Sequence, residues 1–148
     1  MPSDGIIPGD RPINLTAIDH VVFRVSDVAG AIRFYENVLG ARLERTVADI
    51  GLYQLRAGTS LIDLVDVAGS LGQQGGAAPA EAGGLNVDHV CLRVLPWDEA
   101  AILAHLANHG ITDARVSSRY GAEGFGPSIY IRDPAGNTIE LKGPPGAV

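Results

Sequence analysis

The feature that most constrains the fold of this chain is an eight-residue segment that occurs twice. Residues 18–25 read Ile-Asp-His-Val-Val-Phe-Arg-Val, and residues 87–94 read Val-Asp-His-Val-Cys-Leu-Arg-Val. Both segments are rich in β-branched and apolar residues, which predicts a strand in each. Because internal repeats indicate repeated structural units, we expect two related half-domain modules in this chain.

Each repeated segment places its polar residues on one face of the predicted strand. Side chains alternate between the two faces of a strand, so His20 and Arg24 share a face. By the same alternation, His89 and Arg93 share the equivalent face of the second strand. The sequence therefore predicts two matching faces, each with one histidine and one arginine.

The elements predicted after each repeat come in the same order. In the first module, a helix with its N-cap at Asp27 ends near Gly40, where a C-cap glycine belongs. In the second module, Pro96 is expected to open a helix that ends at Gly110. The strands expected after these helices are residues 42–48, 52–56 and 60–67, and then residues 114–118, 128–132 and 138–142, with a loop at 119–126. Both modules therefore have the order βαβββ, which is an α+β arrangement.

The predicted organisation is a pair of small modules that share one core. The expected divisions are a lead-in at 1–14, a first module at 15–67, a Gly/Ala-rich linker at 68–85, a second module at 86–143 and a tail at 144–148. The linker has no apolar periodicity, and its glycines match no phosphate-binding pattern.

Composition excludes several classes of partner. The net charge of −6 argues against nonspecific binding of nucleic acid, which needs a basic surface. No apolar run approaches the roughly 20 residues that span a bilayer, and the N-terminus lacks the features of a signal peptide. The single cysteine, Cys91, rules out an intrachain disulfide and fits a reducing compartment. We therefore expect a cytoplasmic protein that binds neither nucleic acid nor a membrane.

The repeat also gives each module a carboxylate at the same place in its last strand. Asp63 lies in Leu61-Ile62-Asp63-Leu64, and Glu140 lies in Thr138-Ile139-Glu140-Leu141. Together with His20 and His89, they form two matched histidine–carboxylate pairs. Two imidazoles and two carboxylates suit a divalent ion such as Mn, Fe, Co, Ni or Zn. If each module forms half a cup, the pairs converge and leave coordination positions for water or substrate.

Other residues near the predicted ligands have two readings each. Arg24 and Arg93 either pair with acidic neighbours or bind an anionic substrate through forked hydrogen bonds. Tyr120 lies in the predicted loop, which either closes over a ligand or is a plain flexible connection. Tyr130 either lines the cup, where it would contact substrate, or packs in the core. Cys91 is expected to be a small lining residue and not a nucleophile.

The whole pattern resembles the vicinal oxygen chelate superfamily, which includes glyoxalase I, extradiol dioxygenases, fosfomycin-resistance enzymes and bleomycin-resistance proteins. The residues that carry the resemblance are Ile-Asp-His-Val-Val at 18–22, Ala-Ile-Arg-Phe-Tyr-Glu-Asn-Val-Leu-Gly at 31–40 and Tyr-Ile-Arg-Asp-Pro-Ala-Gly-Asn-Thr-Ile-Glu-Leu at 130–141. The resemblance covers about residues 15–143 and implies a curved mixed-sheet cup with a metal ion inside. It also implies a homodimer, in which each cup is formed within one chain or between two chains.

The chain departs from the family pattern at one predicted ligand. Asp63 stands where glyoxalase-like members usually carry Glu or Gln, and its side chain is shorter by one methylene. Asp63 would then bind the metal directly, through water, or not at all. Without it, His20, His89 and Glu140 would form the histidine–histidine–carboxylate set that non-heme iron enzymes also use.

The resemblance implies three functions that the sequence leaves open. The first is a glyoxalase-like, metal-dependent lyase or isomerase that acts on a small, anionic substrate, with Glu140 as the catalytic proton shuttle. The second is a non-heme iron dioxygenase that cleaves rings. The third is a metal-free, drug-binding resistance protein of the same fold. The retained histidines and carboxylates favour the first.

Overall fold

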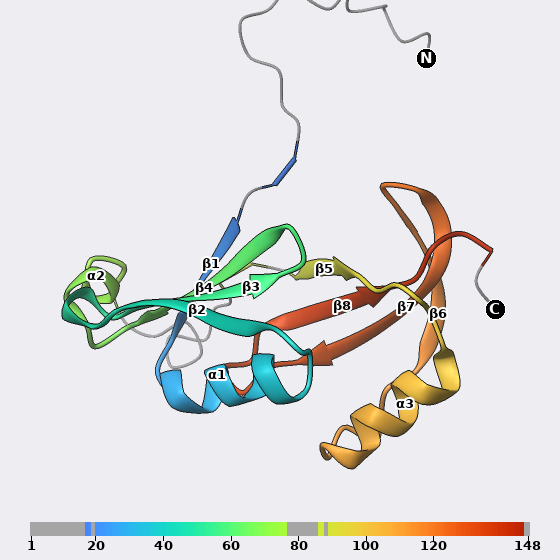
Figure 1. The fold of residues 1–148 in the computed structure, drawn as a ribbon, viewed down its shortest axis with the longest axis horizontal. Coiled ribbons are helices and arrows are strands. Elements are labelled where there is room, and N and C mark those ends of the chain that lie inside the picture. Colours follow the sequence, from blue (N-terminus) through green and yellow to red (C-terminus); the bar gives the residue numbers. More distant parts are fainter. Residues whose placement is uncertain (1–16, 19, 77–85, 88, 147–148) are drawn as a thin grey trace, which may run out of the picture.

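Two four-stranded mixed sheets make up the framework of the protein in a computed structural model, which describes residues 17–18, 20–76, 86–87 and 89–146 (Figure 1). The strand order is β1-β4-β3-β2 in one sheet and β5-β8-β7-β6 in the other. The first strand of each module pairs in parallel with the last, and the other pairs are antiparallel. The prediction of an α+β fold with two βαβββ modules is therefore confirmed. The predicted lead-in at 1–14 lies outside the described residues.

The elements of the first module follow the predicted pattern closely. They are β1 (His20–Val25), α1 (Val28–Asn37), β2 (Arg42–Val47), the short 3₁₀ helix η1 (Ala48–Ile50), β3 (Leu52–Ala57) and β4 (Ser60–Asp66). The carboxylate of Asp27 accepts a hydrogen bond from the Gly30 amide at 2.9 Å, so the predicted N-cap is confirmed. Gly40 follows the helix with a φ of 72°, a left-handed conformation that favours glycine.

The second module corrects two predictions. Its elements are β5 (Val90–Arg93), α3 (Glu99–Asn108), β6 (Val116–Gly121), β7 (Gly124–Arg132) and β8 (Thr138–Lys142), and the linker contains the short helix α2 (Ser70–Gln73). The helix begins at Glu99 and not at Pro96, because the Asp98 carboxylate caps it by accepting from the Ala101 amide at 3.1 Å. The loop predicted at 119–126 is instead the end of a β-hairpin, in which Gly121 pairs with Gly124.

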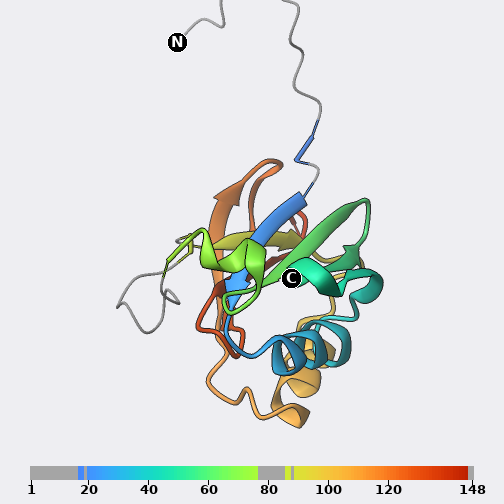
Figure 2. The same cartoon turned by 90° about the vertical axis from the view of Figure 1, so that its left-hand side faces the viewer.

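Both long helices lie on the same side of the two sheets (Figures 1 and 2). The buried side chains between helices and sheets form one cluster that includes Phe23, Tyr35 and Leu55 from the first module and Leu106 and Ile129 from the second. The modules therefore share one core, and the other face of each sheet points away from the helices. No helix in the described part of the chain is long and apolar enough to cross a membrane.

A buried polar contact joins the two modules at the turn between β7 and β8. The Tyr35 hydroxyl donates to Asp133 Oδ2 at 2.7 Å, and the Asn137 side chain donates to the same oxygen at 2.8 Å. Asp133 Oδ1 accepts the amides of Ala135 and Asn137 at 3.0 and 2.8 Å. Burial, followed by the charge of Asp133, raises the pKa of Tyr35 far above its usual value. The turn thus holds the second module against helix α1.

Candidate functional site

The second module brings a predicted histidine and carboxylate into contact. His89 Nε2 lies 3.3 Å from Glu140 Oε2, and the Glu140 carboxylate is buried while His89 is partly exposed. Cys91 in β5 and Tyr130 in β7 are both opposite Glu140 in the strand register, so the three side chains form one row on one face. The rings of His89 and Tyr130 meet edge to face, with centroids 5.7 Å apart. We call His89 and Glu140 the module 2 half-site.

Two neighbours of Glu140 in this row have raised pKa values. Burial, followed by the charge of Glu140, raises the pKa of the Cys91 thiol to about 11. Burial and Glu140 also raise the pKa of the Tyr130 hydroxyl. Both groups are therefore neutral near pH 7. A neutral thiol is a poor nucleophile, which agrees with the prediction that Cys91 is a lining residue.

A cavity of about 310 Å³ lies directly beside the module 2 half-site. Its lining is His89, Cys91, Arg93, Tyr120, Gly121, Ala122, Glu123, Glu140, Lys142 and Gly143. A larger cleft of about 900 Å³ lies between the β3–β4 hairpin and α3, but none of the four predicted metal ligands lines it. The smaller cavity is therefore the one that combines predicted ligands with predicted substrate contacts.

The β6–β7 hairpin forms one wall of this smaller cavity. Glu123 at its tip pairs with Arg93 Nε at 2.5 Å, so Arg93 has the acidic neighbour that one of its two readings expected. Tyr120 and Phe125 face each other across the hairpin, with ring centroids 5.2 Å apart, and both are largely exposed. Tyr130 is 38% exposed, so the reading that packs it in the core is wrong.

Lys142 is a charged lining residue that sequence reasoning missed. It lies two residues after Glu140 in β8, and therefore on the same face of the strand. Its Nζ donates to the carbonyl of Arg119 and to that of Gly126, the latter at 3.3 Å, and the side chain is buried. Strand alternation from Glu140 was the signal that could have identified it.

The first module carries the equivalent pair in the same register. Val22 is opposite Asp63 in β4, just as Cys91 is opposite Glu140, and each histidine precedes that position by two residues. Asp63 is buried, and its Oδ2 accepts a hydrogen bond from Gln54 Nε2 at 3.0 Å. The other oxygen, Oδ1, is buried without a hydrogen-bond partner. We call His20 and Asp63 the module 1 half-site.

Arg24 has partners that neither sequence reading anticipated. Its guanidinium donates to the carbonyls of Gly72 and Gly76, at 3.0 and 2.5 Å. Gly72 lies in α2, and Gly76 follows that helix. A substrate anion would have to replace these carbonyls before Arg24 could bind it, so this assignment stays a prediction.

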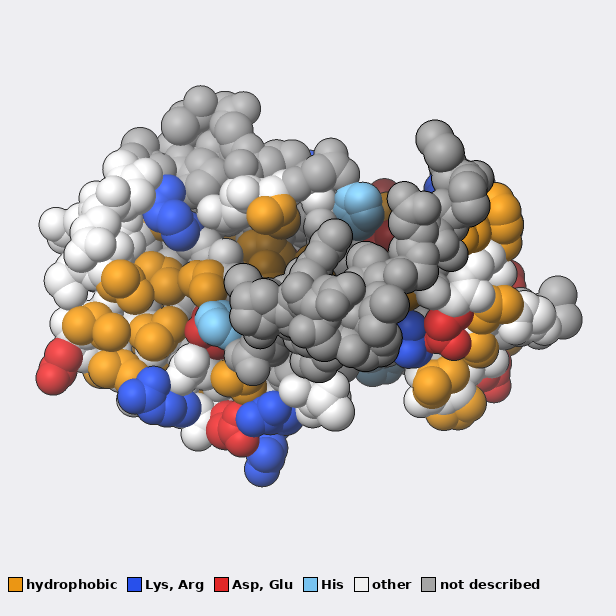
Figure 3. Space-filling model, turned by 90° about the horizontal axis from the view of Figure 1, so that it is seen from above, with side chains coloured by type: hydrophobic (Ala, Val, Ile, Leu, Met, Phe, Trp, Pro, Cys, Tyr) orange, Lys and Arg blue, Asp and Glu red, His pale blue; other side chains and the backbone are white. Residues whose placement is uncertain are grey.

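The two half-sites belong to different sheets of one chain. Within the described ranges, no group of three or more His, Cys, Asp or Glu side chains could hold a metal ion. On the face opposite the helices, histidine side chains are visible at separate places (Figure 3). The convergence of all four predicted ligands therefore stays a prediction.

The comparison with known families agrees with this architecture. Residues 17–141 match the family model described as the Glyoxalase/Bleomycin resistance protein/Dioxygenase superfamily. The chain belongs to this superfamily. Virulence protein STM3117 from Salmonella typhimurium is 32% identical over 129 residues, which cover 84% of this chain and 81% of that protein. Its crystal structure matches with a TM-score of 0.70 and 27% identity, over 89% of this chain and 99% of that one.

Other solved structures have the same fold. An integron cassette protein from the mobile metagenome of V. cholerae has a TM-score of 0.65 and 26% identity, over 88% of this chain and 97% of its own. Lactoylglutathione lyase from Agrobacterium tumefaciens has a TM-score of 0.57 and 22% identity, over 88% of this chain and 95% of that one. At that identity, the likeness to the lyase concerns the fold alone.

Proposed function

We propose that this protein is a metal-dependent lyase or isomerase of the superfamily and that it acts on a small, anionic substrate. The observation that carries the proposal is the 3.3 Å contact between His89 and Glu140, beside a cavity lined by Arg93 and Lys142. A histidine–carboxylate pair suits a divalent metal, and two cationic side chains suit a substrate carboxylate or phosphate.

The donor groups of both half-sites fit a divalent ion. An unpartnered polar atom in the interior costs about 1–3 kcal/mol, and Asp63 Oδ1 is such an atom. A metal ion would give that oxygen a partner, and imidazole with carboxylate is a donor set for Mn, Fe, Co, Ni or Zn. When bound, the metal would polarise substrate oxygens. His20, His89, Glu140 and Asp63 are the residues that would hold it.

A complete site requires the two half-sites to combine. Each module offers two protein ligands, whereas catalytic metal sites generally use three or four. His20 begins β1 and His89 directly precedes β5, and both strands are edge strands of their sheets. We therefore place the first module of one chain against the second module of another, in a homodimer with two equivalent sites. A twofold dimer of this kind buries the same surface on both chains.

The protein's own groups have distinct roles in this proposal. Glu140 acts as the proton shuttle, because a buried carboxylate beside the reacting atoms can take a proton and return it. Tyr130 keeps its proton and can donate a hydrogen bond to Glu140 or to a substrate oxygen. Arg93 and Lys142 orient the anionic part of the substrate, which would replace the Glu123 carboxylate and a hairpin carbonyl as their partners. Tyr120, on the hairpin wall, limits the access of water to the cavity.

The test is direct measurement of bound metal. Equilibrium dialysis against Ni²⁺, Mn²⁺, Zn²⁺ and anaerobic Fe²⁺ should give one ion per chain, and His89→Ala should lose it. His109→Ala, at the exposed end of α3, is the matched control and should keep the metal. A wild-type protein that binds none of these ions would refute the proposal.

Activity assays then separate the proposed reaction from the two alternatives. The metal-loaded protein should convert at least one hemithioacetal, dicarbonyl or epimerisable thioester. Oxygen uptake with catechols by the iron-loaded protein would support the dioxygenase alternative instead. Thermal stabilisation by bleomycin-like compounds, with none by metals, would support drug binding.

A further inference from the structure

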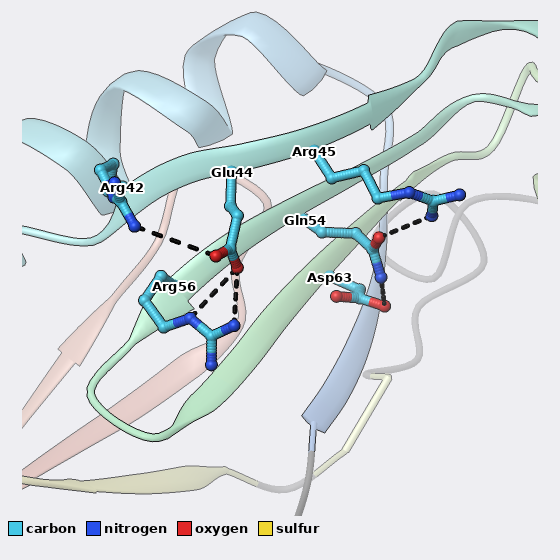
Figure 4. A network of polar contacts seen from close by, with 6 residues as sticks. All are labelled: Arg42, Glu44, Arg45, Gln54, Arg56 and Asp63. Atoms are coloured by element: carbon cyan, nitrogen blue, oxygen red, sulfur yellow. Dashed lines mark hydrogen bonds and ion pairs between the residues drawn. The ribbon is translucent and has the colours of Figure 1, made fainter.

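We propose that Gln54 is a positioning residue that prepares Asp63 to bind metal, and that Arg45 holds Gln54 in the orientation this requires. The inference rests on the proposed metal site and deepens it, because it names the residues that orient one of the proposed ligands. We call Arg45, Gln54 and Asp63 the relay (Figure 4). Arg45 Nη1 donates to Gln54 Oε1 at 2.8 Å, and Gln54 Nε2 donates to Asp63 Oδ2 at 3.0 Å.

The relay depends on an irregularity in strand β2. Leu43 pairs with Leu55, and a regular antiparallel ladder would then place Glu44 opposite Gln54. The register shifts between Leu43 and Arg45, so that Arg45 is opposite Gln54 instead. Bulges of this kind often re-aim side chains near functional sites.

The displaced Glu44 forms a separate contact group. Its carboxylate accepts two hydrogen bonds from Arg56, at 2.8 and 3.1 Å, and lies 3.9 Å from Arg42 (Figure 4). The shift therefore moves a carboxylate away from Gln54 and brings a guanidinium to it. As a result, the neighbour of the Gln54 amide on β2 is a hydrogen-bond donor and not an acceptor.

The neighbour on β2 decides which way the Gln54 side-chain amide is oriented. A guanidinium can only donate hydrogen bonds, so Arg45 binds the amide oxygen of Gln54. The amide nitrogen then faces Asp63, to which it must donate. With Glu44 in place of Arg45, the amide nitrogen would turn toward β2 and its oxygen would face the carboxylate of Asp63. Arg45 thus selects the one amide orientation that supports Asp63.

The relay leaves one oxygen of Asp63 available. Asp63 is 3% exposed, Oδ2 is bound by Gln54, and Oδ1 has no hydrogen-bond partner. Metal-binding carboxylates are commonly oriented by hydrogen bonds of this kind from residues that do not touch the metal. The arrangement assigns Oδ1 as the metal-binding atom and Oδ2 as the anchored atom.

The equivalent position in the second module has a different residue. Tyr130 is opposite Glu140 in the register, as Gln54 is opposite Asp63. The longer Glu140 has a tyrosine and a thiol beside it, whereas the shorter Asp63 has an amide held by a guanidinium. The two carboxylates therefore differ in how they are held, because only Asp63 has an amide donor opposite it in the register.

The test compares Ni²⁺ affinity by calorimetry in the full-length protein. Gln54→Met keeps the length of the side chain but removes the donor, and it should weaken binding about 10- to 100-fold. Asp63→Ala should weaken binding at least as much. Gln74→Met, an exposed glutamine outside the relay, is the matched control and should bind Ni²⁺ as the wild type does.

A second pair of variants separates the relay from general charge effects. Arg45→Met and Arg42→Met remove the same charge from the same strand, but only Arg45 contacts Gln54. Loss of a cation by itself should strengthen binding of Ni²⁺. The relay instead predicts that Arg45→Met weakens Ni²⁺ binding several-fold relative to Arg42→Met. It also predicts a shifted NMR signal for the Gln54 side-chain amide in Arg45→Met and an unshifted one in Arg42→Met.

The outcomes distinguish the relay from the metal site itself. If Asp63→Ala loses affinity while Gln54→Met and Arg45→Met bind like their controls, the relay is refuted and the metal site stands. If the wild type binds no metal, the metal site fails and the relay fails with it. If Gln54→Met does not fold, the exposed Arg45→Met variant and its amide signal decide the question.

Discussion

Removal of one hydroxyl should measure how strongly the two modules are coupled. In Tyr35→Phe, the hydrogen bond to Asp133 at 2.7 Å is lost from a buried position. A hydrogen bond to a charged group contributes about 1.5–3 kcal/mol. Because Asn137 still donates to the same oxygen at 2.8 Å, no acceptor is left without a partner. The free energy of unfolding should therefore fall by an amount at the lower end of this range, about 1.5–2 kcal/mol.

Thermal unfolding followed by circular dichroism is the appropriate assay. For a chain of this size, each kcal/mol lowers the Tm by about 2–4 °C, so Tyr35→Phe should lower it by about 3–8 °C. Tyr53→Phe, at a partly buried position in β3, is the matched control and should change the Tm by less than about 2 °C. Equal Tm values for Tyr35→Phe and the wild type would refute the claim that this bond couples the modules.

The same variant predicts a dependence on pH. The pKa of Tyr35 is raised in the folded protein, whereas in the unfolded chain it titrates near 10. The stabilisation is therefore complete below about pH 10 and declines above it, because the unfolded chain then ionises more readily. The difference in Tm between the wild type and Tyr35→Phe should shrink between about pH 9.5 and 11. A difference that grows with pH would contradict this assignment.

Three further predictions follow from single sites. Gly72→Ala should destabilise the fold by about 1–3 kcal/mol in urea titration, because an added Cβ would lie 1.9 Å from the Asp66 carbonyl oxygen; an unchanged midpoint would contradict it. Glu140→Gln should lower kcat about 100-fold or more once a substrate is known, and retention of full activity would exclude the proton-shuttle role. Alkylation of Cys91 by iodoacetamide at pH 8 should be slower than that of a free thiol, because its pKa is raised to about 11; a rate equal to that of free cysteine would show that the thiol is unperturbed.

The local parts of the structure were predictable because they depend on short patterns. Alternation in the repeated segment predicted that His20 and His89 take equivalent places, and Asp27 had the chemistry of an N-cap. Each of these signals acts over a few neighbouring residues.

The missed features depend on contacts between strands. Gly121 and Gly124 indicated a loop, but the cross-strand pair of Tyr120 and Phe125 extends the sheet to the hairpin tip. Gln54 gains its role only because the register shift in β2 moves Arg45 opposite to it. A repeat predicts that half-sites exist, but it does not determine which surfaces meet. The sequence therefore could not predict how the half-sites combine into a metal site.

The most direct test of the proposed shared site is metal binding by mixed dimers. His20→Ala and His89→Ala chains, carrying different affinity tags, would be refolded together and the doubly tagged dimer isolated. In a shared site, one of the two centres then receives both intact histidines, and the other receives neither. With a shared site, the mixed dimer should bind one Ni²⁺ ion with wild-type affinity, while each parent homodimer should bind weakly. Weak binding in the mixed dimer, equal to that of the parents, would contradict it.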